Sequence, residues 1–322
     1  GSAELRETIC ECLMRHRELI CHPDQVVITA GTTQAIGLAC TLLLDQRQKV
    51  ILEDPITHDI QRIVSDNGAR IYPVSVDSDG LQTALLPEDI TPACIYVTPS
   101  HQFPFGATLP IQRRIELVRY ATEKDCFIIE DDYDSEFRFD GPVLSSLHSL
   151  SPDRVIYIGT FSKTLCPAVR IGYMVLPPQL ISRGRRRKWQ SDLHNEVVSQ
   201  LALARFMEQG HYFRHIAKIR ICYRNRRNVL VESLEECFGD RMKVLGSATG
   251  LHLIAQFEGC NFTQEILEEI ERRGAKFYAL ASHAITPGDH GDKLLIGYGN
   301  LTRTDIANGI KILSDSVISL RC

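Results

Sequence analysis

The chain has 322 residues, a formal net charge of −4 and a pI near 6.3, with 44% hydrophobic and 24% charged residues. This length accommodates one large globular domain or two ordinary ones, and the acidic balance argues against nucleic-acid binding by this chain alone. The sequence has no apolar run of about 18 residues, the length that a membrane-spanning helix requires, so no membrane span is expected.

The first residues indicate a piece of a longer protein. Gly1-Ser2 resembles a cloning remnant, and a helical pattern begins at Ala3, so residues 1–20 are expected to form an N-terminal helical segment. The eleven cysteines are scattered, without a CxxC pair or a Cys/His cluster of metal-ligand spacing, and no metal site is expected. Without a signal peptide, reduced thiols and a cytoplasmic location are expected.

Apolar strand-like runs alternate with helical patterns over the first two thirds of the chain. Near-continuous apolar strands separated by helices predict a mostly parallel sheet covered on both faces, here a large α/β domain over residues 21–225. Functional side chains in such a sheet gather at the carboxyl ends of the strands. The expected strands are Gln25–Ala30, Lys49–Asp54, Ala69–Val76, Ala93–Pro99, Cys126–Asp132 and Arg154–Thr160, and the expected helices include Gly31–Leu44, His58–Asn67 and Pro110–Asp125.

The remaining third has a different pattern. The basic run Arg183–Gln190 is interpreted as a solvated helix face or loop, with a partner- or DNA-facing patch as the alternative. A helical stretch from Asn195 to Glu236 follows, and then Leu251–Phe257 alternates as a half-exposed antiparallel strand would. Residues 226–322 are therefore expected to form a smaller α+β domain. Its other expected elements are a helix over Thr263–Gly274, strands over Ala275–Leu280 and Lys293–Asn300, and a last helix.

A turn of small residues follows the first expected strand. Gly31, Thr32, Thr33 and Gln34 open a helix, where free backbone N–H groups and the positive end of the helix dipole suit a phosphate. The alternative for this turn is a simple N-cap.

Charged and hydroxyl residues follow two later strands. Asp131, Asp132, Tyr133 and Asp134 follow the apolar part of one strand, where carboxylates can also be caps or metal ligands. Lys163 and Arg170 follow the next strand, with Thr160 and Ser162 just before the lysine in sequence. A lysine amine forms a Schiff base with an aldehyde, and a carboxylate keeps a pyridine nitrogen protonated. Hydroxyls and an arginine hold a phosphate monoester. Together these residues predict a pyridoxal 5'-phosphate site. The alternative is a surface lysine beside an ion-paired arginine.

Longer motifs resemble a known family. "GTFSKTLCPAVRIGY" (residues 159–173) is similar to the lysine signature of fold-type I aminotransferases. "TPSHQFPFG" (98–106), "IIEDDYDSEFR" (128–138), "EDP" (53–55) and "EQGHYFRHIAKIRICYRNRR" (208–227) resemble the MocR type of bacterial GntR-family regulator. In that family a winged helix-turn-helix precedes an aminotransferase-like effector domain. The resemblance implies a fold-type I domain, a homodimer, and DNA binding only through a domain absent from this chain.

The resemblance also assigns roles to individual residues. Lys163 matches the Schiff-base lysine, Asp131 the partner of the pyridinium nitrogen, and Tyr133 the donor to the ring hydroxyl. His101, with Gln102, lies in the loop usually beside the ring. Thr32, Thr33, Thr160, Ser162 and Arg170 match phosphate-binding positions, and Gln34 borders the same turn.

Three positions depart from the pattern of the family. Phe103-Pro104-Phe105 replaces the asparagine and threonine of ordinary aminotransferases. The tyrosine that often follows "EDP" and stacks on the ring is replaced by Thr57 or His58, and His58 could stack or face solvent. The C-terminal arginine for the substrate carboxylate is missing, so Lys293 and Arg303 are the candidates for this role.

The resemblance implies a sensor function. Pyridoxal phosphate would form an internal aldimine on Lys163, and an amino acid or amine effector, such as D-alanine or 4-aminobutyrate, would form an external aldimine with little or no turnover. The cofactor itself is the other candidate effector. The alternatives are a catalytically competent aminotransferase, and an interaction scaffold that has lost the cofactor. The missing arginine and the replaced asparagine favour sensing over transamination, and the intact Lys163, Asp131 and Tyr133 argue against the scaffold.

Overall fold

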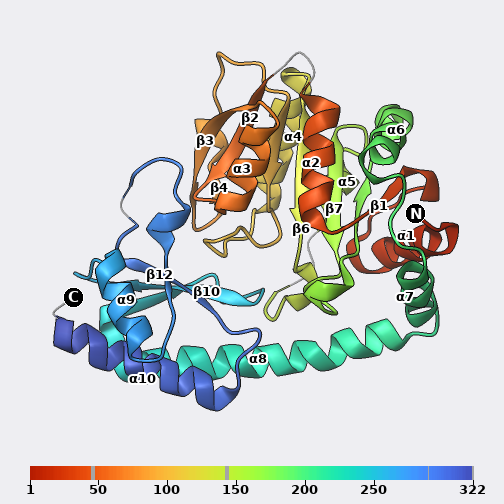
Figure 1. Ribbon diagram of the computed structural model, residues 1–322. Helices are drawn as coiled ribbons and strands as arrows, with labels where there is room; N and C mark the ends of the chain where they lie inside the picture. Colours follow the sequence, from red (N-terminus) through yellow and green to blue (C-terminus); the bar gives the residue numbers. More distant parts are fainter. Residues whose placement is uncertain (45–47, 142–144, 289, 321–322) are drawn as a thin grey trace.

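The computed structural model describes residues 1–44, 48–141, 145–288 and 290–320. Within these residues the chain forms an eight-stranded and a four-stranded sheet (Figure 1). The order in the larger sheet is β1-β8-β7-β6-β5-β2-β3-β4. Its strands are β1 (Val26–Thr29), β2 (Lys49–Asp54), β3 (Arg70–Asp77), β4 (Gly80–Leu81), β5 (Cys94–Val97), β6 (Phe127–Asp132), β7 (Val155–Thr160) and β8 (Gly172–Val175).

The middle of this sheet is parallel, as the sequence predicts. β3, β2, β5, β6 and β7 pair in parallel, whereas β8 runs antiparallel to both β7 and β1. In the pairing of β6 with β7, Asp132 lies opposite Gly159. The two strands therefore end at the same edge of the sheet, and the residues that follow them meet there.

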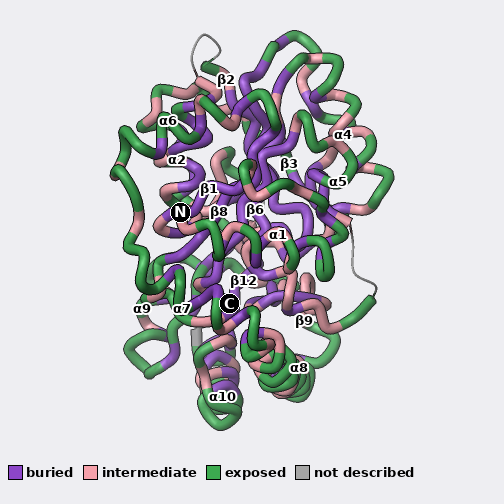
Figure 2. The backbone as a smooth tube through the Cα atoms, turned by 90° about the vertical axis from the view of Figure 1, so that its right-hand side faces the viewer, coloured by how far each residue is buried: buried purple, intermediate pink, exposed green. Residues whose placement is uncertain are grey.

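Helices cover both faces of the large sheet. α2 (Thr32–Leu43) and α3 (His58–Asp66) share one apolar cluster with Ile156 and Ile158 of β7. On the other face, α4 (Ile111–Glu123) packs with Val155, and the short α5 (Leu147–Leu150) lies beside it. Because successive residues of a strand point to opposite faces, burial on both sides explains the near-continuous apolar strands. Figure 2 shows these strands as the buried centre of the molecule.

The smaller sheet is antiparallel and has the order β11-β12-β10-β9. Its strands are β9 (Met242–Leu245), β10 (His252–Phe257), β11 (Tyr278–Ala279) and β12 (Lys293–Gly297). One face packs on α8 (His211–Phe238), α9 (Gln264–Arg272) and α10 (Arg303–Leu320). The mixed fold class, a large and mostly parallel sheet with a smaller α+β unit, is therefore confirmed.

The expectation that β10 is half-exposed was wrong. Every residue of β10 except Gln256 is buried. Leu253 and Ala255 face the helices, whereas Ile254 on the opposite face packs with Phe103 and Phe105 of the large domain. The second face is covered because the two domains meet there.

The predicted helical stretch from Asn195 to Glu236 is broken into two helices. α7 (Val198–Glu208) ends before Gly210, which has a φ of +71° that favours glycine, and α8 then begins. Tyr212, near the start of α8, is buried against the large domain, and Leu230 and Leu234 are buried against the small sheet. The predicted domain boundary at residues 225/226 therefore lies inside one helix that spans both domains (Figure 1).

The N-terminal helix belongs to the large domain. α1 (Ala3–Arg17) buries Leu5, Ile9 and Leu13, a four-residue spacing that places all three on one face. This face packs with α7.

The predicted basic run lies on α6 (Ile181–Asp192). Arg185, Arg186 and Arg187 are all exposed on this helix, and Arg185 forms an ion pair of 2.6 Å with Asp24, which is itself exposed. Lys188 of the same run is buried and forms an ion pair with Asp192, so the run is only partly a solvated helix face. None of the described helices is both long and apolar enough to cross a bilayer.

Candidate functional site

A cavity of about 470 Å³ lies where the carboxyl ends of the large-sheet strands face the small sheet. This volume is in the range of small-molecule and cofactor sites. The large domain contributes most of the wall, and residues from β10, β11 and β12 close the other side. The lining residues include Thr32, Thr33, Tyr96, Thr98, Asp131, Tyr133, Asp134 and Lys163 from the large domain, and Leu251, His252, Tyr278, Leu295 and Gly297 from the small one.

Asp131, near the end of β6, is a buried carboxylate with one free oxygen. Its Oδ2 accepts a hydrogen bond of 2.5 Å from the hydroxyl of Tyr96 on the neighbouring β5. Its Oδ1 is buried and has no hydrogen-bond partner among the described residues. Burial raises the pKa of Asp131 from 3.8 to about 7, although the hydrogen bond from Tyr96 lowers it. A cationic N–H group in the cavity would satisfy the free oxygen and restore the ionised form.

Lys163 lies in the loop that follows β7. Its side chain is exposed, lines the cavity, and makes no hydrogen bond or ion pair with any described residue. Within the same loop, the hydroxyls of Thr160 and Ser162 lie 3.1 Å apart, and the Ser162 amide donates to Oγ1 of Thr160. The lysine amine is therefore free to react with a ligand in the cavity that Asp131 also lines.

Tyr133 and His101 meet beside Asp131. The Tyr133 hydroxyl donates to the backbone oxygen of His101 at 2.9 Å, and Nδ1 of the His101 ring lies 2.7 Å from Oδ2 of Asp134. The ring of His101 stacks on that of His252 from β10, with centroids 4.5 Å apart. Burial lowers the pKa of His101 to about 3, so this histidine is neutral at pH 7.

A cradle for an anion lies at the start of α2. Gly31 is the N-cap, with a φ of +93° and no side-chain cap, so the first amides of the helix are open to a ligand. The Arg170 guanidinium donates to the backbone oxygen of Ala30 at 2.6 Å, and a Cβ on Gly31 would lie only 3.3 Å from it. The open amides at the start of α2 and the Arg170 guanidinium thus lie on either side of Gly31, an arrangement that suits a phosphate.

The structure brings part of the predicted site together. Thr32, Thr33, Asp131, Tyr133 and Lys163 all line the cavity. Arg170, Thr160, Ser162 and His101 do not line it themselves. Arg170 lies beside Gly31, the residue before Thr32, and His101 contacts Tyr133. Thr160 and Ser162 contact each other in the loop that carries Lys163.

Four predicted residues lie away from the cavity wall. Gln34 is held by Ala30 and by Asp192, which accepts a 2.8 Å hydrogen bond from its amide. His58 is exposed, and its ring lies near that of His283, with the ring centroids 6.4 Å apart. Nζ of Lys293 forms an ion pair of 2.6 Å with Asp292, and Arg303 is exposed at the start of α10.

Several lining residues were not predicted from the sequence. Tyr96 lies in a predicted apolar strand. Its hydroxyl could have indicated a nearby polar group, because a buried tyrosine needs a hydrogen-bond partner. Ile56 and Leu295 line the cavity with apolar atoms, and His252 enters it from the small domain. Nothing in the local pattern around these three residues indicates a site, whereas Phe103, which also lines the cavity, lies in a motif that the resemblance placed near the ring.

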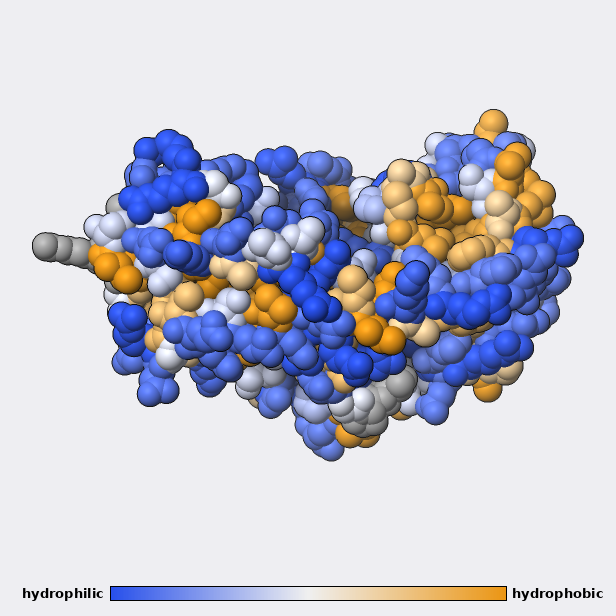
Figure 3. Space-filling model, turned by 90° about the horizontal axis from the view of Figure 1, so that it is seen from below, coloured by the Kyte–Doolittle hydropathy of each residue, from blue (hydrophilic) through white to orange (hydrophobic). Residues whose placement is uncertain are grey.

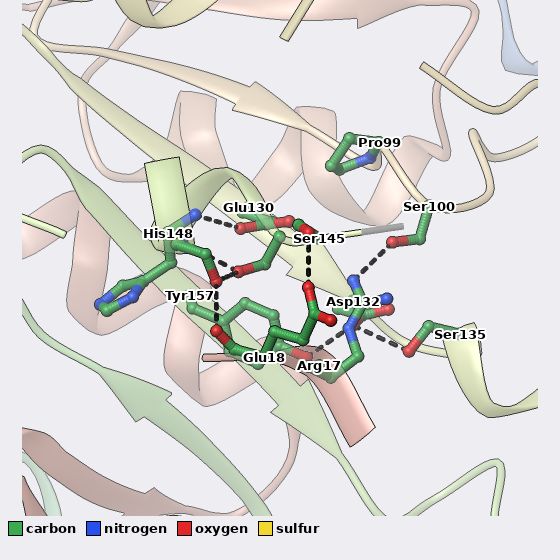
Figure 4. Close-up of polar contacts among 12 residues, drawn as sticks. Arg17, Glu18, Pro99, Ser100, Glu130, Asp132, Ser135, Ser145, His148 and Tyr157 are labelled. Carbon is green, nitrogen blue, oxygen red and sulfur yellow. Dashed lines mark hydrogen bonds and ion pairs between the residues drawn. The ribbon is translucent and has the colours of Figure 1, made fainter. Parts of the chain in front are cut away.

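A second polar cluster surrounds Asp132, the residue after Asp131 (Figure 4). Asp132 Oδ2 forms an ion pair with Arg17, whose Nε lies 2.9 Å away, and accepts hydrogen bonds from the Tyr157 hydroxyl at 2.5 Å and the Ser135 hydroxyl at 2.8 Å. Arg17 also donates to Ser100 at 2.8 Å. This cluster ties the end of α1 to the strand that carries Asp131. No group of three or more metal-ligating side chains occurs in the described parts of the chain.

Comparison with known proteins relates the chain both to aminotransferases and to transcriptional regulators. The family model described as aminotransferase class I and II matches residues 1–283. The HTH-type transcriptional regulator YhdI of Bacillus subtilis (strain 168) is 37% identical, over 97% of this chain and 66% of that protein. The probable rhizopine catabolism regulatory protein MocR of Rhizobium meliloti is 30% identical, over 99% of this chain and 65% of its own length.

Among solved structures, the kynurenine aminotransferase of Pyrococcus horikoshii superposes with a TM-score of 0.91 at 26% identity, covering 99% of this chain and 81% of that one. It was solved in complex with PMP, the amine form of the cofactor predicted from the sequence. By contrast, the chain spans about two thirds of the length of the regulators that it matches.

Proposed function

Because the chain belongs to the aminotransferase class I and II family, in the form that MocR-type regulators of the GntR family carry, we propose that it is a sensing domain. It holds pyridoxal 5'-phosphate on Lys163 and binds a small amine or amino acid as effector. DNA binding belongs to a separate helix-turn-helix segment of the full-length regulator.

The observation that carries this proposal is the free, buried Oδ1 of Asp131 in the cavity that Lys163 lines. The protonated ring nitrogen of the cofactor would pair with this oxygen, and Lys163 would hold the aldehyde carbon. The phosphate would lie at the start of α2, near Arg170. When bound, the cofactor supplies an electrophilic carbon that captures a primary amine in exchange for Lys163.

The two domains both line the cavity, which suits a sensor. An effector between the small sheet and the large sheet would bind most tightly to the conformation in which both walls contact it. This difference in affinity between conformations is what would shift the protein toward that conformation. The cluster of Arg17 and Asp132 connects the same wall to α1, the helix nearest to any preceding segment.

We propose further that the chain forms a homodimer. Trp189, Leu193, Val197, Val198 and Leu201 are exposed on α6, α7 and the segment between them, with Trp189 60% and Val198 76% exposed. Apolar residues gather at the end of the molecule where α7 lies (Figures 1 and 3). A patch of this kind is typical of a protein interface. Sedimentation at micromolar concentration is expected to give a dimer, and a cofactor-loaded monomer would contradict it.

The sensor is tested by spectral titration of the cofactor-loaded protein against small amines and amino acids, including both enantiomers of alanine and 4-aminobutyrate. A saturable spectral change without accumulation of keto acid is expected. Repeated turnover to a keto acid, with a second keto acid as acceptor, would instead establish an aminotransferase.

A further inference from the structure

Carboxyl groups outnumber arginine and lysine side chains on the described wall of the cavity. The lining carboxyl groups are those of Asp59, Asp131 and Asp134, whereas Lys163 is the one arginine or lysine that lines the cavity among the described residues. In the proposed function, Lys163 holds the cofactor and Asp131 pairs with its ring. A bound ligand then faces Asp59 and Asp134 without an arginine or lysine of the described wall beside it.

The two cations that the sequence offered for a ligand carboxylate lie elsewhere. The ammonium of Lys293 pairs with Asp292, although Leu295 and Gly297 of the same strand line the cavity. Arg303 is exposed on α10. Arg170 lies against Gly31, at the end of the site that suits the phosphate.

Apolar side chains make up much of the wall that α3 and the small domain contribute, beside the polar Thr57 and Asp59. Ile56, Ile60 and Ile63 line it from the segment around α3, and Leu251, Tyr278 and Leu295 line it from the small domain. Ile60 and Leu295 are each 7% exposed, so a ligand that touches them is largely withdrawn from water. The polar ring nitrogen Nε2 of His252, which could serve a ligand, already lies 3.2 Å from the backbone oxygen of Pro104.

We infer that the ligand selected by this cavity is a primary amine with an apolar body and without a carboxylate. The inference rests on the proposed function, since the amine group must reach the cofactor on Lys163. A ligand carboxylate would lose its hydration next to apolar side chains, and no arginine or lysine of the described wall would compensate for that loss. Asp59 would also repel it. Amines without a carboxylate carry no such cost.

The first test compares matched ligands on the cofactor-loaded protein. Propylamine is titrated against 2-aminobutyrate, which adds an α-carboxylate, and 4-aminobutyrate, which adds a terminal one. The readouts are the cofactor absorbance and the ligand-dependent shift in melting temperature. Each half-saturation concentration is divided by that of the same amine with free pyridoxal phosphate, which removes differences in amine basicity.

After this correction, propylamine is expected to bind at least ~10-fold more tightly than either carboxylate-bearing ligand. Equal or tighter binding of 2-aminobutyrate or 4-aminobutyrate would overturn the inference. A protein in which no cofactor attaches to Lys163 would refute the proposed function itself, so the two failures are distinguishable.

A second test adds the missing charge. Leu295→Arg should improve binding of the carboxylate-bearing ligands relative to propylamine by about tenfold, whereas Leu295→Met, the uncharged control, should leave the ratio unchanged within ~3-fold. If Leu295→Arg does not fold, the exposed Asp59→Asn provides the same test. Asp66→Asn, an exposed position on the same helix outside the cavity lining, is its control. If neither Asp59→Asn nor a folded Leu295→Arg protein changes the binding of carboxylate-bearing ligands relative to propylamine, the inference is contradicted.

Discussion

The hydroxyl of Tyr96 donates a 2.5 Å hydrogen bond to Oδ2 of Asp131, and Oδ1 of the same carboxylate stays buried without a partner in the described chain. The two residues lie on adjacent parallel strands, with Tyr96 in β5 opposite Ile129 of β6, two residues before Asp131. Tyr96 therefore holds one oxygen of a carboxylate that lines the cavity and leaves the other without a partner.

Replacing this carboxylate should weaken cofactor binding. In Asp131→Asn the charge-assisted hydrogen bond to the ring nitrogen is lost, and such bonds contribute about 1.5–3 kcal/mol. The dissociation constant for pyridoxal phosphate should rise by about 10- to 150-fold, as measured by absorbance or fluorescence titration. Asp66→Asn, an exposed position on α3, should leave it unchanged. Unchanged affinity in Asp131→Asn would mean that another group faces the ring nitrogen.

The cofactor-free protein should show the titration of Asp131. Burial raises the pKa of Asp131 from 3.8 to about 7, so between about pH 4 and 7 the folded protein keeps a proton that the unfolded chain has released. Stability falls with rising pH wherever the native state binds more protons. The free energy of unfolding of the wild type minus that of Asp131→Asn should therefore fall from about pH 4.5 to 7.5 and then level off.

Urea denaturation at a series of pH values measures this difference. Glu53, whose pKa burial also raises to about 7, is present in both proteins, so its contribution largely cancels. A difference that rises with pH over this range would show that Asp131 is ionised in the cofactor-free protein.

The buried ion pair of Arg17 and Asp132 should stabilise the attachment of α1. The side chains are 9% and 1% exposed, and removal of one partner leaves the other charge buried and uncompensated. Arg17→Met should destabilise the protein by about 3–5 kcal/mol in urea denaturation. Arg15→Met, on the same helix but 61% exposed, should cost less than about 0.5 kcal/mol. Equal, small effects of the two substitutions would argue against this role of the pair.

Gly31 should be required for phosphate binding. Its φ of +93° and ψ of 178° belong to a region essentially restricted to glycine, where another residue costs about 1–3 kcal/mol, and a Cβ would crowd Arg170. Gly31→Ala should therefore reduce both stability and affinity for pyridoxal phosphate, the latter by at least ~10-fold.

The matched control lies on the same helix. A methyl group on Gly37 would meet no neighbouring side chain or strand within 4 Å, so Gly37→Ala should stabilise α2 by about 0.5–1 kcal/mol without affecting the cofactor. Retention of full cofactor affinity in Gly31→Ala would show that the phosphate does not lie at the start of α2.

The sequence predicts the strands of the large sheet well because burial on both faces leaves an unmistakable apolar run. β2 has the predicted bounds, and the ends of β6 and β7, which position Asp131 and Lys163, coincide with the predicted ends. Gly210, in contrast, divides a continuous helical pattern, and a single glycine within such a pattern does not by itself indicate a break.

Contacts between distant parts of the chain could not be predicted. The amide of Gln34 bonds to Asp192, 158 residues away, and this contact turns it from the cavity. Tyr96 reaches Asp131 only because β5 and β6 are neighbours in the sheet, and His252 enters the cavity only because the small domain packs there. Local pattern indicates which residues end a strand, but the packing of domains decides which of them share a wall.

Covalent attachment of the cofactor to Lys163 is the central requirement of the proposed function. The purified protein is incubated with pyridoxal phosphate, reduced with borohydride, digested and analysed by mass spectrometry, with Lys163→Ala treated in parallel. The reduced cofactor is expected on the peptide that contains Lys163, and Lys163→Ala is expected to show neither this adduct nor the visible absorbance band. An adduct on another lysine in the wild type, or an unchanged trapped band in Lys163→Ala, would contradict this assignment.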